Sequence, residues 1–287
     1  MILRAVQSLI MFERHLAQMP GRQRLSLLIG FLLLSLVLSK FIQLPTRNVA
    51  VSVLGSPLGV DLSSEWLMAV LLAGLACTGT DALVRTHPHA QTVGLSYTFV
   101  YWALPGLLGL VTARLLALAP TQTLWVAGLV GAGLLFAVVL TAEYTTVDPL
   151  APAHSQARLL LNTIAYAVAF ALFVIVYEAR SRSLVTVTAT LITSFALALD
   201  LLWSSNANAS RTATLAGAIA LILGECSWAM NYWQISSWSA GIVLLLIFYV
   251  LTGIATQHLQ GRLKRYMLIE YAIVTIAGTA VLIVFHP

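Results

Sequence analysis

The sequence predicts an all-α protein, a polytopic bundle of about nine transmembrane helices, from two observations. The first is composition: hydrophobic residues make up 60% of the 287 residues, charged residues only 9%, and the mean hydropathy is +0.92. A soluble domain carries about 25% charged residues, so this chain has too little polar surface to face water on all sides. The composition therefore excludes a secreted disulfide scaffold, a nucleic-acid-binding module and a disordered chain.

The second observation is a series of apolar runs separated by polar segments. A helix needs about 20 mostly apolar residues to cross a hydrocarbon core about 30 Å thick while satisfying its own backbone hydrogen bonds. The expected spans cover residues 25–44, 65–82, 95–117, 122–142, 158–177, 184–203, 212–231, 239–257 and 267–285. The second run is short and rich in small residues, and a bundle of eight spans is the alternative.

The chain ahead of these spans has a different pattern. Residues 1–20 are predicted to form an amphipathic interfacial helix that ends at Pro20-Gly21, and residues 21–287 to form a single transmembrane domain. The helix is expected to lie on the membrane surface, and docking on a partner subunit is the alternative.

Residues 47–62, between the first two spans, are predicted to form a short outer loop or a β-hairpin. Apolar and polar residues alternate there around a Gly55-Ser-Pro-Leu-Gly59 turn. Ser63 or Ser64 is expected to cap the second span, with Glu65 at the positive end of that helix.

The basic residues predict the orientation of the bundle, because Lys and Arg resist translocation. Ten of the fifteen lie on one side of a nine-span bundle and five on the other. We therefore expect a cytoplasmic N-terminus and an outer C-terminus. On the predicted inner side, Asp81 and Arg85 are spaced four residues apart, as in a helix-end ion pair.

The third span holds Pro105-Gly106 at its centre, with Tyr101 in the preceding turn. Proline lacks a backbone donor, so a kink is expected. Broken helices near the midplane form the substrate sites of several transporters, and this is the alternative to a plain kink.

The sixth span carries Thr186, Thr190, Thr193 and Asp200 on one helical face. A polar stripe is costly in lipid, so this face should point into the bundle. It serves either helix packing or a polar pathway that ends at Asp200.

The seventh span contains Glu225, the acid that the expected spans place deepest. An ionised carboxylate in hydrocarbon costs several kcal/mol, so Glu225 should be paired, protonated or open to a water-filled cavity. Arg114, near the outer end of the third span, is a candidate partner, and Asn231 lies in the same polar run as Glu225. A functional and a structural role are equally compatible with this pattern.

Small residues recur every fourth position in three spans, which lets helix backbones approach closely. The expected packing seams are Ala69, Ala73 and Cys77; Gly128 and Ala132; and Ala216, Ala220 and Gly224.

The sequence contains no catalytic motif, no metal-ligand spacing and no predicted cofactor site. It has no GxSxG, Walker or dinucleotide-binding pattern, and its two cysteines lie apart. Five of the six histidines fall on the predicted inner side, and Trp228, Trp233 and Trp238 cluster near the outer interface. Contact with haem, quinone or a pigment is the alternative to loop histidines and an aromatic belt.

Several short motifs resemble an uncharacterised bacterial family of multi-pass membrane proteins. They are Leu54-Gly-Ser-Pro-Leu-Gly, Gly79-Thr-Asp81, Arg85-Thr-His-Pro88, Asn231-Tyr-Trp233 and Phe248-Tyr-Val-Leu-Thr-Gly253. The resemblance implies the bacterial cytoplasmic membrane and no particular activity.

These patterns favour a non-enzymatic accessory or scaffold subunit that packs with membrane lipids and other membrane proteins. The alternative is a transporter or channel for a small or lipid-like solute, which would use Pro105, the polar stripe and Glu225. A third hypothesis is an intramembrane enzyme that acts on lipid. Nucleic acid is not an expected partner, because basic residues in a membrane chain reflect its topology.

Overall fold

The computed structural model of the protein describes residues 22–42, 47–53, 56–93, 98–179, 183–203, 208–233 and 235–261. The elements of these segments are α2 (Arg22–Phe41), β1 (Arg47–Val53), β2 (Ser56–Leu62), α3 (Ser64–Arg85), α4 (Pro88–Val93), α5 (Val100–Ala117), α6 (Gln122–Thr146), α7 (His154–Glu178), α8 (Ser183–Trp203), α9 (Ala209–Met230) and α10 (Ser237–Leu259).

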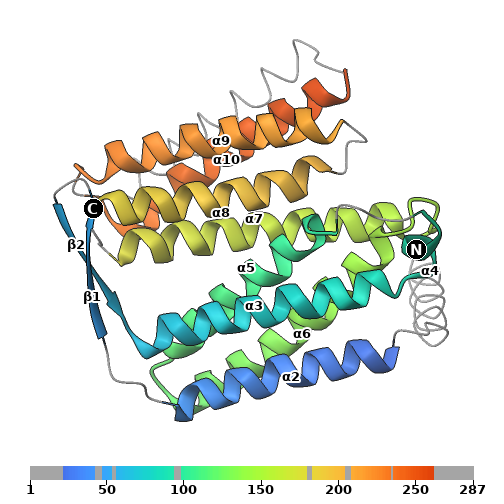
Figure 1. Cartoon of the computed structure of the whole chain (residues 1–287), viewed down its shortest axis with the longest axis horizontal. Coiled ribbons are helices and arrows are strands. Elements are labelled where there is room, and N and C mark those ends of the chain that lie inside the picture. Colours follow the sequence, from blue (N-terminus) through green and yellow to red (C-terminus); the bar gives the residue numbers. More distant parts are fainter. Residues whose placement is uncertain are drawn as a thin grey trace, which may run out of the picture.

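The described helices form a bundle of the expected class. Eight of them, α2, α3 and α5 to α10, are long and apolar enough to cross a membrane. The two strands lie at one end of the bundle and the short α4 at the other (Figure 1), and we call these the hairpin end and the α4 end. This architecture confirms a polytopic helix bundle. The expected interfacial helix over 1–20 and the ninth span over 267–285 lie outside the described residues.

The segment between α2 and α3 is a β-hairpin, which decides between the two expected structures. The strands are antiparallel, with Arg47 opposite Leu62 and Val53 opposite Ser56. At the start of α3, the Ser63 side chain accepts a hydrogen bond from the amide of Trp66 at 3.5 Å. The expected cap of the second span is therefore confirmed at Ser63.

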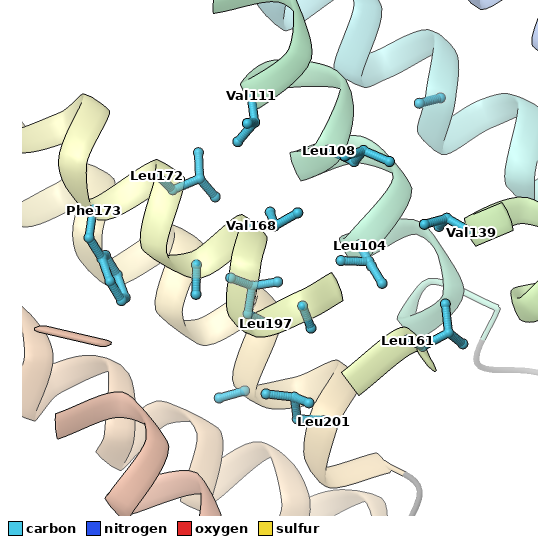
Figure 2. Close-up of a cluster of buried hydrophobic side chains, with 14 of the residues drawn as sticks. Leu104, Leu108, Val111, Val139, Leu161, Val168, Leu172, Phe173, Leu197 and Leu201 are labelled. Atoms are coloured by element: carbon cyan, nitrogen blue, oxygen red, sulfur yellow. The ribbon is translucent and has the colours of Figure 1, made fainter. Parts of the chain in front are cut away.

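Helix α7 lies at the centre of the bundle, where it packs against α5, α6, α8 and α10. Figure 2 shows part of the resulting core, with Leu104 and Leu108 of α5 near Val168 and Leu172 of α7 and Leu197 of α8. All five side chains are buried. Large apolar side chains are also exposed on the outer helices, as a lipid-facing surface requires.

Small residues bring two pairs of helices into close contact. A Cβ at Gly106 of α5 would lie 2.5 Å from the Cys77 sulfur of α3, and one at Gly109 would lie 3.4 Å from the backbone of Ala73. On α9, a Cβ at Gly224 would meet Val187 of α8 at 3.6 Å. These contacts use residues of the expected seams in the second and seventh spans.

Three helix boundaries differ from the expected spans by four residues or more. Helix α5 begins at Val100 rather than 95, because Thr98 and Phe99 form a turn in which the Tyr101 amide donates to the Thr98 carbonyl. Pro105 therefore lies in the second turn of α5 rather than at the centre of a span. Helix α6 continues to Thr146 and α7 already begins at His154, so both extend further toward the α4 end than expected.

Candidate functional site

Three charged side chains meet inside the bundle toward the α4 end. Glu143 lies near the end of α6, Arg158 near the start of α7 and Asp200 near the end of α8. Residue Glu143 is 0% exposed and Asp200 is 2% exposed. The Arg158 side chain is 14% exposed, so it is the member of this group that is nearest to the surface. We call these three residues the charged cluster.

The guanidinium of Arg158 contacts both the side chain and the backbone of Asp200. The Arg158 Nη1 lies 3.7 Å from the Asp200 Oδ1, and the Arg158 Nη2 donates a hydrogen bond to the Asp200 carbonyl at 3.1 Å. At 3.7 Å the side-chain contact is an ion pair without a hydrogen bond, and Asp200 Oδ1 has no hydrogen-bond partner among the described residues. This pair fixes the end of α8 against the start of α7.

Glu143 is the least satisfied group of the charged cluster. Neither of its carboxyl oxygens has a hydrogen-bond partner among the described residues, although both oxygens are buried. Its charge interacts with those of Asp200 and Arg158. Two carboxyl groups thus face one guanidinium, which can neutralise only one of them. The second carboxyl needs a proton or another cation, because an uncompensated buried charge is costly.

Helix α5 adds a hydroxyl beside the charged cluster. Tyr101 is half-buried, and the charges of Glu143, Arg158 and Asp200 all act on its phenol group. Pro105 is buried four residues later and has no amide hydrogen for the carbonyl of Tyr101. The structure therefore brings Tyr101 and Asp200, two expected site residues, to the same end of the bundle.

A second polar network lies where α3 meets α5. Arg85 Nε and Asp81 Oδ2 form an ion pair at 2.7 Å, which confirms the expected pairing. The indole of Trp102 donates to Asp81 Oδ1 at 3.2 Å, and Arg85 Nη2 donates to the Thr98 hydroxyl at 3.1 Å. These contacts hold the start of α5 against the end of α3.

A histidine packs on α6 at Tyr144, the residue that follows Glu143. The ring of His87 makes an edge contact with Tyr144, with ring centroids 4.5 Å apart. Burial lowers the pKa of His87 below the ordinary value for histidine, and the charge of His89 lowers the pKa further, while the charge of Asp148 opposes the shift. His87 therefore favours its neutral form in the folded protein.

The polar stripe of α8 points into the bundle, as the sequence predicts. Thr186, Thr190 and Thr193 are all buried. The Thr190 hydroxyl bonds the Thr186 carbonyl at 2.9 Å and meets the Ser227 hydroxyl of α9 at 3.3 Å. The Thr193 hydroxyl donates to the carbonyl of Ala189 at 2.8 Å. These threonine contacts serve helix packing, and the stripe reaches the charged cluster only at Asp200.

Glu225 is placed differently from the expectation. It is exposed on the outer face of α9, in line with Leu221 and Trp228, whereas Gly224 faces α8. The expected pairing with Arg114 is wrong, because Arg114 forms an ion pair with Glu65 at the start of α3. The physical reason is the helical period, which turns Glu225 by about 100° away from the packed face of Gly224.

Asn231 lies at the hairpin end and does not contribute to the charged cluster. It follows the last turn of α9, where its backbone amide donates a hydrogen bond to the carbonyl of Ser227 at 3.2 Å. Its side-chain nitrogen is buried without a hydrogen-bond partner among the described residues. Nearby, the Tyr177 hydroxyl donates to the Met230 carbonyl at 2.9 Å and ties α7 to α9.

Sequence reasoning missed Glu143 as a site residue because the fourth span was expected to end at 142. A signal was available in the spacing of Phe136, Val139, Leu140 and Glu143, which share one helical face. The first three are buried, so the face continues to Glu143. Arg158 is the first residue of the expected fifth span, so the sequence marks it only as one of the basic residues that indicate topology.

The charged cluster offers carboxylates but no complete metal site. In the part of the chain that the structure describes, no group of three or more His, Cys, Asp and Glu side chains could hold a metal ion. The chemistry within reach of the cluster is the binding of a proton or a single small cation by Glu143 and Asp200, with Arg158 as the fixed positive charge.

The comparisons with known proteins give a family and no activity. A search of curated proteins and a search of solved structures each found no match. A family model matches residues 44–285, which is most of the chain and includes the whole charged cluster. The chain therefore belongs to the family described as "Protein of unknown function (DUF5656)".

Proposed function

We propose that this protein is a membrane transporter whose cycle includes the binding and release of a proton at Glu143 and Asp200. This is the transporter alternative of the sequence analysis, with Glu143 in place of Glu225. The single observation that carries the proposal is the fully buried Glu143, whose two oxygens lack hydrogen-bond partners among the described residues.

The charge balance of the cluster supports this proposal. Arg158 is held by Asp200 at 3.7 Å, so Glu143 is the carboxyl left without its own counter-charge. Ionisable groups within membrane segments are rare and commonly mark ion pathways and proton relays. A group whose charge is balanced only when a proton is present is suited to couple a conformational change to proton binding.

The position of the cluster also supports proton exchange. Arg158, the most exposed member, lies in the first two turns of α7, close to the α4 end of the bundle. The distance from Arg158 to the first residue of α7 is about 6 Å along the helix axis at 1.5 Å per residue. A proton would therefore cross a short distance from the water at that end.

A pH step on a solid-supported membrane tests the proposal without knowledge of the solute. The full-length protein is reconstituted in liposomes adsorbed on an electrode, and proton entry into a buried site gives a transient current. We expect a current for the wild type, loss of that current in Glu143→Gln and a strong reduction in Asp200→Asn.

Glu225→Gln is the matched control, because it removes an exposed acid from a neighbouring helix. It should retain the wild-type current. An equal current in the wild type and in a correctly folded Glu143→Gln variant would overturn the proposal, as would the lack of any current in the wild type.

A second function, that of an accessory subunit, is favoured by the exposed Glu225. Glu225 lies five residues before the end of α9, which is roughly 7.5 Å from that end along the helix axis. Its neighbours Leu221 and Trp228 are also exposed, so the carboxylate faces lipid unless something covers it. A membrane partner that supplies a basic or hydrogen-bonding side chain would offset this cost.

Native electrophoresis of gently solubilised membranes tests this second function. If Glu225 binds a partner, Glu225→Gln should shift the protein from a larger complex to a smaller one. Glu178→Gln, which changes an exposed acid at the end of α7, should not. Equal migration of all three proteins would exclude this role for Glu225.

A further inference from the structure

A polar cleft lies between the start of α9 and the end of α10, apart from the charged cluster. Its cavity volume is about 540 Å³. It is lined by Asn208, Ser210, Arg211, Thr214 and His258, together with two leucines. We call it the α9–α10 cleft.

The lining of this cleft is rich in hydrogen-bond donors and contains no acidic side chain among the described residues. Arg211 supplies a permanent positive charge and is exposed, and His258 adds ring nitrogens from the facing helix. Ser210 supplies a hydroxyl group, whereas the Thr214 hydroxyl donates its hydrogen to the Ser210 carbonyl at 2.9 Å. The cleft therefore presents positive charge and polar hydrogens that no described carboxylate balances.

The cap of α9 leaves the side-chain nitrogen of Asn208 available to a ligand in the cleft. The Asn208 side-chain oxygen accepts from the Ser210 amide at 3.3 Å, so the Asn208 amide nitrogen is not used in the cap. Arg211 lies in the first turn of α9, and Arg has the planar donor set that matches phosphate oxygens.

We propose that the α9–α10 cleft binds a phosphate group. Its level in the bundle points to the phosphate of a membrane phospholipid, because α9 begins and α10 ends there, where spanning helices meet the headgroup layer. The two leucines would lie beside the first carbons of the lipid chains. A free phosphate ion shares the same chemistry and would use the same donors.

Two ligand arms separate these sources. The purified full-length protein is titrated in a phosphate-free, uncharged detergent with a short-chain phosphatidylglycerol in one arm and with inorganic phosphate in the other. Stabilisation against thermal unfolding reports binding in both arms. A lipid phosphate predicts saturable stabilisation by phosphatidylglycerol, and a soluble phosphate ligand predicts saturable stabilisation by inorganic phosphate.

The variants assign the effect to the cleft. We expect Arg211→Gln to lower the affinity for the stabilising ligand by roughly tenfold or more, because one charge-assisted hydrogen bond is lost. Arg24→Gln, an exposed arginine on α2 at the same end of the bundle, is the matched control and should bind as the wild type does.

A second readout keeps the proposal testable if Arg211→Gln unfolds early. Native mass spectrometry counts phosphatidylglycerol molecules retained by the wild type and by His258→Asn, which leaves α9 unchanged. Fewer retained lipids in His258→Asn would support a lipid site in the cleft. Saturable binding in neither arm, or equal binding by the wild type, Arg211→Gln and His258→Asn, would overturn the proposal.

Discussion

The guanidinium of Arg158 lies 3.7 Å from the carboxylate of Asp200 inside the bundle, and the same guanidinium bonds the Asp200 carbonyl at 3.1 Å. Helices α7 and α8 are therefore joined by a charge pair inside the bundle. Glu143 adds a second carboxyl to this pair, and the stability of the bundle should depend on how these three charges balance.

Removal of Arg158 should be strongly destabilising. Arg158→Gln leaves two buried carboxyl groups without a positive charge, and breaking a buried pair in this way costs about 3–5 kcal/mol. Thermal unfolding in detergent measures the effect. Arg85→Gln is the control. The Arg85 side chain is 61% exposed, so the ion pair between Arg85 and Asp81 should contribute at most about 1 kcal/mol to stability.

Neutral replacement of the partner acid should recover part of this loss. In the double variant Arg158→Gln and Asp200→Asn, no charge of the original pair remains, so the free energy of unfolding should exceed that of Arg158→Gln alone. A double variant as unstable as the sum of its two single variants would show that the two side chains do not interact.

The close approach of α3 and α5 gives a packing prediction. Gly106→Ala places a methyl group 2.5 Å from the Cys77 sulfur, so it should destabilise the bundle by about 1–3 kcal/mol. Adding Cys77→Ala should restore most of the loss, because the next atom, the Ala73 carbonyl oxygen, is 3.6 Å away. Gly131→Ala meets nothing within 4 Å and should not destabilise.

His87 should make stability depend on pH. Its pKa is lower in the folded protein than in the unfolded chain, so the unfolded chain binds more protons between the two pKa values. Stability should therefore rise with pH in that window and fall as the pH drops below about 6.5. Unfolding temperatures in a pH series measure this slope. It should be smaller in His87→Asn than in the wild type.

Local patterns explain why much of the fold could be predicted from the sequence. The apolar runs locate eight long helices, the alternation after Asn48 indicates the hairpin, and the four-residue spacing of Asp81 and Arg85 gives their ion pair. Each of these features depends on residues close together in the chain, so hydropathy and spacing are sufficient.

The candidate site could be predicted only in part, because it depends on which helices meet. The stripe that ends at Asp200 was identified from its helical period, but its partner Arg158 lies on another helix. Glu143 directly follows the expected fourth span, so the apolar run alone does not indicate that its side chain is buried. Glu225 lies within its apolar run, yet the face it occupies is set by the packing of α8 against Gly224.

The most direct test of the central claim is the infrared spectrum of the reconstituted protein in the region of uncharged carboxyl groups. We predict a protonated carboxyl band that shifts with a pH step and disappears in Glu143→Gln, while Glu225→Gln leaves the band in place. A wild-type spectrum without a pH-sensitive protonated carboxyl, or a band that persists in Glu143→Gln, would contradict proton binding by the charged cluster.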